Sequence, residues 1–261
     1  LDGFTGGNIA VARAYIADVT TKEDRPKGMA VIGISFGVGF ILGPAIGGIL
    51  FGFGDSHFIP ALVAGSLSLI AMILTLVILK EPTKHTETKS STSHLKSIPQ
   101  LIKNPAILLI CFVQIAYMII FSGFETTFSI FTNRTFNYDE QQNSMLFFYI
   151  GMLALVIQGY LSQKASSKVK LVSILGLSIF AVSIIFLGFS TTIPLLLICL
   201  VFLSLGISLI NTYIPSLLTM NSSSNIGSTM GIFESLNSLS RIFGPLIVYT
   251  TFFTKLPLLY T

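Results

Sequence analysis

Long apolar runs separated by short polar segments dominate the chain. The run from Gly28 to Gly54 has 27 residues without a charged side chain. Because a helix rises about 1.5 Å per residue, about 20 residues cross the ~30 Å hydrocarbon core of a bilayer. The pattern predicts an all-α integral membrane bundle with about seven full spans and a partial first one. The expected full spans are residues 28–54, 58–79, 105–131, 145–161, 171–189, 195–220 and 228–253, and residues 1–17 form the partial one.

The amino-acid composition also indicates an integral membrane protein. Hydrophobic residues make up 52% of the chain, charged residues 10%, and the mean hydropathy is +0.83. Soluble domains carry about 25% charged residues, so this chain needs the bilayer as its solvent. Alternating Val/Thr strand patterns are absent, which favours a helical bundle over a barrel. Cys111 and Cys199 lie inside apolar runs and are interpreted as small buried hydrophobes, so no metal or other cofactor is expected.

The distribution of Lys and Arg predicts the orientation. Residues 18–27, 80–104, 162–170 and 220–227 together hold 11 cations. The alternate connections, 55–57, 132–144, 190–194 and 254–261, together hold 2. Cytoplasmic loops carry the excess of Lys and Arg, so the first set is predicted to be cytoplasmic. The net charge of +4 is therefore a topology signal, and no nucleic-acid partner is expected.

A short internal repeat indicates two tandem halves. Ile41–Ile46 (ILGPAI) matches Ile242–Ile247 (IFGPLI) at an offset of 201 residues. Six expected spans separate the copies, as parallel six-helix repeats require. We therefore expect a truncated piece of a twelve-helix parent. Its predicted parts are residues 1–79 from the N-terminal half (partial helix 4, helices 5 and 6), a cytoplasmic linker at 80–104, and residues 105–261 from the C-terminal half (helices 7 to 11).

The first full span carries an unusual glycine pattern. Gly39, Gly43 and Gly47 recur every four residues and form a stripe on one helix face, followed by Gly48. Such a stripe allows close approach of a second helix within a membrane, and Pro44 predicts a bend. The motif Gly-x-x-x-Gly-Pro-x-x-Gly-Gly resembles the fifth-helix motif of antiporters of the major facilitator superfamily.

The resemblance extends over nearly the whole chain. Leu1–Thr20 is similar to the fourth helix of drug:proton antiporters of the tetracycline-efflux and multidrug type. Arg241–Pro245, which contains the Gly244-Pro245 pair, resembles the signature of their eleventh helix. The chain begins after the position of the family's fourth-helix arginine. Gln163 stands where the family often has Asp, so the second-half loop motif matches only loosely. The resemblance implies that Asp18 latches an inner gate by pairing with a basic loop outside this chain.

Ionisable residues inside spans are costly and are therefore site candidates. Glu125 is the only acid between Asn104 and Asn133, and it is predicted to carry the coupled proton. Asp2, deep in the partial span, is the second candidate.

Other polar residues are assigned to the cavity or to packing. Arg241 shares a helix face with Glu234 and is expected either to pair with a neighbouring helix or to act in transport. Arg13 lies near a helix end and is expected to snorkel. Asn8, Gln114, Asn211 and Asn237 either line a cavity or bond between helices.

The predicted function is proton-coupled efflux of small amphipathic compounds by alternating access of two halves. The alternatives are a same-fold uptake transporter for a sugar or other metabolite, a membrane-embedded enzyme, and a non-transporting receptor or scaffold. The histidines, at 57, 85 and 94, are scattered, which argues against an enzyme. The expected partners are the lipid bilayer, a small-molecule substrate and protons. We expect a multi-pass monomer in the plasma membrane or bacterial inner membrane.

Overall fold

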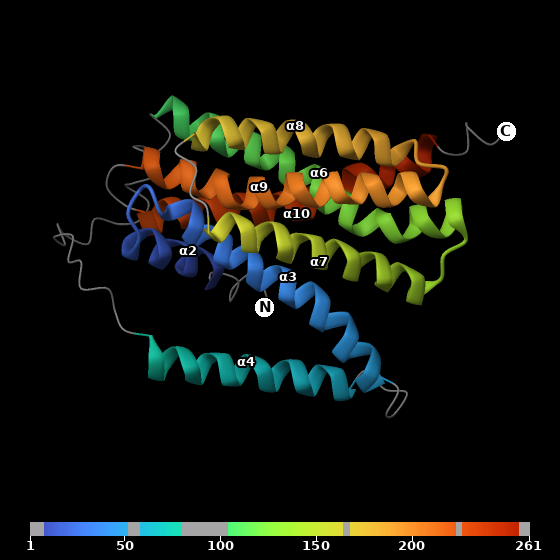
Figure 1. The fold of residues 1–261 in the computed structure, drawn as a ribbon, viewed down its shortest axis with the longest axis horizontal. Helices are drawn as coiled ribbons and strands as arrows, with labels where there is room; N and C mark the ends of the chain where they lie inside the picture. The colour runs from blue at the N-terminus through green and yellow to red at the C-terminus, as the bar shows by residue number, and fades with distance from the viewer. Residues whose placement is uncertain (1–7, 52–57, 80–103, 164–167, 223–225, 256–261) are drawn as a thin grey trace.

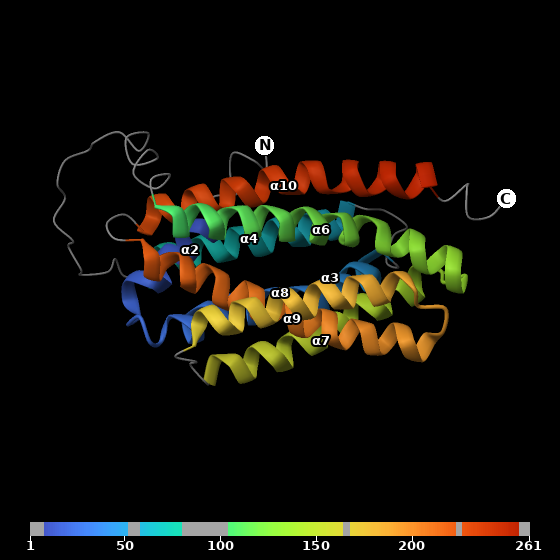
Figure 2. The ribbon, with the colours of Figure 1, turned by 90° about the horizontal axis from the view of Figure 1, so that it is seen from above.

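A computed structural model describes residues 8–51, 58–79, 104–163, 168–222 and 226–255. Within these ranges all regular structure is helical. The helices are α2 (Asn8–Val19), α3 (Arg25–Phe51), α4 (Phe58–Ile78), α6 (Pro105–Phe136), α7 (Glu140–Gln163), α8 (Val169–Gly188), α9 (Ile193–Asn221) and α10 (Ile226–Lys255). Figures 1 and 2 show them running along one common axis. The predicted helical bundle is therefore confirmed. The linker at 80–103 lies outside the described residues.

Among the described helices, five are long and apolar enough to cross a membrane, namely α4, α6, α7, α8 and α9. Their outward surfaces are apolar, and α4 has no buried residue among its 21. Exposed leucines, isoleucines and valines on this scale need lipid around them, because water would penalise so large an apolar surface. The expectation of about seven spans stays a prediction.

The helices pack in three main pairs, α8 with α9, α3 with α7, and α6 with α10. In addition α2 packs against α10, and α3 against α9. The helices before residue 79 thus contact those after residue 104 through three of these pairs, α3 with α7, α2 with α10, and α3 with α9. In Figure 1, α4 lies apart from the main bundle, and α3 diverges from α7 toward its own C-terminal end.

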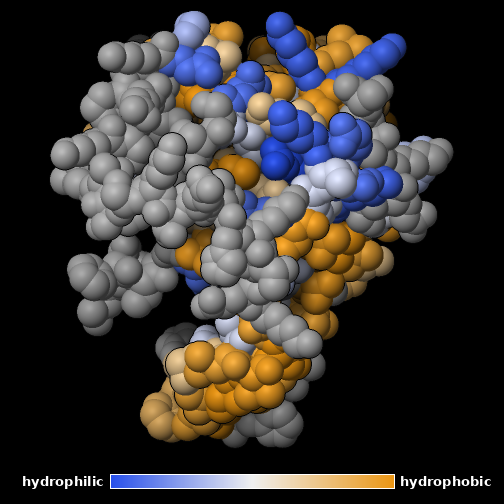
Figure 3. Space-filling model, turned by 90° about the vertical axis from the view of Figure 1, so that its left-hand side faces the viewer, coloured by the Kyte–Doolittle hydropathy of each residue, from blue (hydrophilic) through white to orange (hydrophobic). Residues whose placement is uncertain are grey.

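The helix ends that border the four segments predicted to be cytoplasmic, which together hold 11 cations, lie at one end of the bundle, on the left of Figure 1. Figure 3 looks onto this end and shows hydrophilic residues gathered on it. The exposed residues here include Lys22, Glu23, Lys168 and Lys170. The alternation of loops predicted from the sequence agrees with this arrangement. The assignment of this end to the cytoplasm stays a prediction.

The predicted loop at 132–144 is wrong in extent. Helix α6 continues to Phe136, where Asn137 adopts a left-handed conformation (φ 54°) and its N–H bonds to the carbonyl of Thr132. Helix α7 then starts at Glu140 because Asp139 and Gln142 form a capping box, with reciprocal bonds of 2.7 and 3.0 Å. Hydropathy marks only the apolar part of each helix, whereas capping and backbone hydrogen bonds set where the helix begins and ends.

The close contact of α3 lies nearer its start than the glycine stripe predicts. A Cβ atom at Gly37 would lie 3.2 Å from the backbone nitrogen of Leu155 in α7, and one at Gly33 would overlap the Gln158 side chain. At Gly39 and Gly43 a Cβ would meet nothing within 4 Å in the described part of the chain. These two glycines therefore do not pack against a described helix. Pro44, Gly47 and Gly48 lie within α3, but their surroundings are outside the described side chains.

Helix α10 contacts α6 through its Gly-Pro motif. A Cβ at Gly244 would lie 2.6 Å from the carbonyl oxygen of Ile119, so the two backbones are in direct contact. Pro245 has no N–H to donate to the carbonyl of Arg241 four residues earlier. The Ser122 hydroxyl of α6 donates to that carbonyl instead, at 3.4 Å. The motif therefore joins α6 and α10 closely.

Candidate functional site

A buried ion pair connects the first described helix to the last. Arg13 of α2 donates from Nη1 to the Oε1 atom of Glu234 in α10. Arg13 is only 7% exposed, and its guanidinium lies over the Phe233 ring, 5.6 Å from the centroid. The Glu234 side chain is 16% exposed, so the pair is largely but not fully buried, and its desolvation is repaid only when geometry and hydrogen bonding are good. The prediction that Arg13 snorkels to the helix end is therefore wrong, because a carboxylate faces it inside the bundle.

Two amide side chains extend this pair to a third helix. Asn237 donates from Nδ2 to the second carboxylate oxygen of Glu234, at 3.1 Å. Gln114 of α6 donates from Nε2 to Asn237 Oδ1, at 2.9 Å. The chain Arg13–Glu234–Asn237–Gln114, here called the polar network, thus joins α2, α10 and α6. Gln114 and Asn237 bond between helices, which was one of the two roles expected of them.

The polar network retains unused hydrogen-bonding capacity. Gln114 Oε1 and the Tyr117 hydroxyl have no hydrogen-bond partner among the described residues, although each residue is only 3% exposed. The Tyr117 ring packs against Phe121 and Phe180, with centroids 5.8 and 4.9 Å away. Buried polar atoms without partners are uncommon, and water or a ligand group often satisfies them. The two atoms lie one turn apart on α6, beside the network.

The predicted proton carrier Glu125 lies elsewhere on α6. It is half-buried and forms no hydrogen bond or ion pair with a described residue. Asn211 in α9 is also half-buried without such a bond, and Asn8 is exposed at the start of α2, where it accepts the N–H of Ile9. Asp2 lies outside the described residues. The structure therefore does not bring Glu125, Asn8 and Asn211 into the polar network.

Arg241 and Asp18 are the other predicted charged residues on α10 and α2, and the pairing expected of Asp18, with a loop outside this chain, stays a prediction. Arg241 is exposed and has no ion pair within the described ranges, and its contact with α6 is through its carbonyl. Glu234 pairs with Arg13, and Arg241 takes no part in that pair. Asp18 is exposed at the end of α2, and the nearby cation Arg25 donates to the Ala17 carbonyl at 3.2 Å.

A second buried junction joins α3, α7 and α9. Gln158 of α7 accepts from the Thr212 hydroxyl at 2.8 Å and donates to the Ser208 carbonyl at 3.4 Å. The same amide packs directly onto Gly33 of α3. A glutamine inside an apolar run is the only sequence signal for this role. The junction holds α3 against the later helices without a charge.

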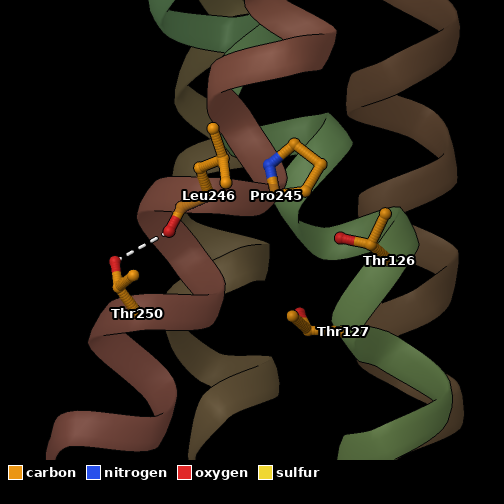
Figure 4. A pocket seen from close by; sticks show the side chains of 5 residues that line it. All are labelled: Thr126, Thr127, Pro245, Leu246 and Thr250. Atoms are coloured by element: carbon orange, nitrogen blue, oxygen red, sulfur yellow. Dashed lines mark hydrogen bonds between the residues drawn. The ribbon is translucent and has the colours of Figure 1, made fainter.

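An apolar pocket of about 200 Å³ lies between α6 and α10 (Figure 4). It is lined by Thr126, Thr127, Pro245, Leu246 and Thr250. The three hydroxyls already donate to carbonyls of their own helices, as Thr250 does to Leu246 at 2.7 Å. The pocket therefore offers no free charge or donor to an ionic ligand.

Lipid-facing helices around a buried polar network define a multi-pass helical membrane protein. The chain belongs to the Major Facilitator Superfamily, whose family model matches residues 1–245. This membership confirms the predicted family and makes a membrane-embedded enzyme untenable.

Individual relatives agree with the family match. Multidrug resistance protein 2 of Bacillus subtilis is 32% identical over 248 residues, which cover 89% of this chain and 59% of that protein. Tetracycline resistance protein, class B, of Escherichia coli is 27% identical over 99% of this chain and 65% of its own length. The crystal structure of the human organic anion transporter MFSD10 superposes with a TM-score of 0.76 at 25% identity, over 96% of this chain and 63% of that one. The chain thus spans about three fifths of the relatives that it matches.

Proposed function

We propose that the protein is a proton-coupled exporter of small amphipathic compounds that works by alternating access of two helix groups. The first group is residues 1–79 and the second is residues 105–261, joined by the linker at 80–104. The buried Arg13–Glu234 pair is the observation that supports this most, because it lies where α2 of the first group contacts α10 of the second. A charge pair between two moving bodies can be made in one state and broken in the other.

The contact between α3 and α7 supports the same proposal. The helices touch closely at Gly33 and Gly37, and α3 diverges from α7 toward its own C-terminal end (Figure 1). The two groups are therefore in contact at one end of this helix pair and further apart at the other end. This is the geometry expected of one of the two access states.

The names of the relatives favour export of amphipathic compounds over uptake of a sugar. Two bacterial relatives are named for multidrug and tetracycline resistance, and the human structure is named for organic anions. A plasma or bacterial inner membrane location and a monomeric state are part of the proposal.

Transport can be tested in proteoliposomes that contain the full-length protein. We expect tetracycline or a lipophilic dye to accumulate inside vesicles with an acidic lumen, because outward proton movement drives inward substrate movement. A protonophore should abolish the accumulation. Uptake that is indifferent to the pH gradient would contradict proton coupling, and absence of any uptake or exchange would contradict transport of these compounds.

The orientation is tested by single-cysteine labelling in a background without Cys111 and Cys199. We expect Thr135→Cys to react with an impermeant maleimide added outside cells, and Glu23→Cys to react only after permeabilisation. Both positions are exposed and lie at opposite ends of the bundle. The reverse labelling pattern would show that the cation-rich end faces outward.

A further inference from the structure

We infer that Glu234 is the residue that binds and releases the coupled proton, and that Arg13 is the positioning residue whose contact with it reports the state of the two helix groups. This inference rests on the proposed proton-coupled transport and identifies the site of coupling. It selects Glu234 over Glu125, the carboxylate that the sequence favours.

The first argument is the location of Glu234. A ligand, including a proton, shifts a conformational equilibrium only if it interacts differently with the two states. Protonation of Glu234 removes the negative partner of Arg13, and that pair bridges α2 and α10. Glu125 forms no hydrogen bond or ion pair with a described residue, so its protonation changes no described contact between the groups.

The second argument is the set of groups around Glu234. Helix α2 contributes Arg13, and α6 contributes Gln114 and Tyr117, with Glu125 two turns further along α6. On α10 itself, Asn237 donates to Glu234, and Arg241 lies two turns away and exposed. Helix α9 carries no charged residue, and its Tyr213 packs in a separate cluster with Ala30 and Val169. Arg13 is therefore the only cation that an ion pair joins to Glu234 within the described residues.

The third argument is that the network holds alternative partners for Arg13. Gln114 Oε1 and the Tyr117 oxygen are buried acceptors without a hydrogen-bond partner in the described ranges. When Glu234 is neutral, the guanidinium still needs acceptors in a low-dielectric site. These two atoms provide them, so loss of the ion pair does not leave a wholly unsolvated charge.

The proposed step balances in protons and charge. In the closed contact, Glu234 is an anion paired with the Arg13 cation. One proton that enters from the end of the bundle opposite the cation-rich end neutralises Glu234 and breaks the pair, and the Gln114 and Tyr117 oxygens then accept from the Arg13 guanidinium. The helices α2 and α10 then separate, Glu234 releases the proton to water that enters from the cation-rich end, and the pair re-forms when the two helix groups close again. One proton is bound and one is released per cycle, and Arg13 keeps its charge throughout.

The decisive experiment compares Glu234→Gln, the double variant R13Q/E234Q and Glu125→Gln in the proteoliposome assay. Glu23→Gln, an exposed acid in the loop after α2, is the matched control that should behave as wild type. We expect loss of pH-driven accumulation in both Glu234 variants. We also expect loss of the proton release that substrate causes in detergent solution, read with a pH-indicator dye. Counterflow by the double variant, which needs no net proton movement, shows that the protein is folded.

The outcomes separate a structural pair from a proton carrier. A structural ion pair predicts that R13Q/E234Q regains uphill transport, because both charges are removed together, and this result would overturn the inference. Loss of coupling in Glu125→Gln with normal coupling in R13Q/E234Q would assign the proton to Glu125 instead. If the wild-type protein itself shows no pH-driven accumulation, the proposed function fails. Failure of the inference about Glu234 is different, because the wild-type protein then accumulates substrate and only the result for the variants disagrees.

Discussion

Arg13→Leu is expected to lower the free energy of unfolding by about 3 kcal/mol, because it leaves the largely buried Glu234 carboxylate, whose side chain is 16% exposed, without its counter-charge. Asn237 supplies one N–H to that carboxylate, which does not replace the guanidinium. The measurement is reversible unfolding in detergent micelles, followed by circular dichroism. The leucine also removes the contact of the guanidinium with the Phe233 ring.

The double variant R13L/E234L isolates the charge effect. Replacing a buried pair by apolar residues of similar size is often neutral or stabilising, so most of the lost stability should return. Lys27 and Asp24 form an exposed ion pair that serves as the matched control, with 2.8 Å between Nζ and Oδ1. The hydrogen bond from Lys27 lowers the pKa of the Asp24 carboxyl. Lys27→Leu should change stability little, since solvent screens exposed pairs. An equally small effect of Arg13→Leu would show that Arg13 and Glu234 are hydrated and only loosely coupled.

The sequence predicted the bundle because hydropathy depends only on local composition. The spans near 58–79 and 105–131 correspond to α4 and α6, and the cation count sorted the connections into two ends. The ion pair was not predictable in this way. Its members are 221 residues apart, and a single sequence carries no signal that relates two distant helix faces. Arg13 lies only six residues from the end of α2, where snorkelling is the usual outcome.

The glycines show the same limit at shorter range. A small residue indicates that a second helix can approach, but the tertiary arrangement decides whether one does. Gly43 fits the predicted stripe, yet no described residue would meet a Cβ there within 4 Å, whereas Gly206 follows no repeat and is in direct backbone contact. The capping box at Asp139 and Gln142 is different, because it is a local pattern that could have corrected the predicted loop.

Gly206→Ala is expected to destabilise the protein by about 1–3 kcal/mol through overpacking between α8 and α9. A Cβ at this position would lie 2.8 Å from the backbone nitrogen of Phe180 and 2.9 Å from its Cα. Backbone atoms of a packed helix cannot rotate aside as a flexible side chain can, so the two helices must separate. Gly206→Leu should prevent the pair from closing and abolish the folded state.

Gly159→Ala is the matched control, since a Cβ at this α7 position would meet no atom of a described residue within 4 Å. Alanine favours a helix over glycine by roughly 1 kcal/mol, so this variant should be as stable as wild type or more stable. The two substitutions are compared by their melting temperatures in detergent. The melting is followed by the near-ultraviolet circular dichroism of the aromatic side chains, which include Phe180. The gain in helix propensity is the same at both positions, so a difference in melting temperature reports the packing alone. If Gly206→Ala melts at as high a temperature as Gly159→Ala, the backbones of α8 and α9 are further apart than the distances to Phe180 indicate.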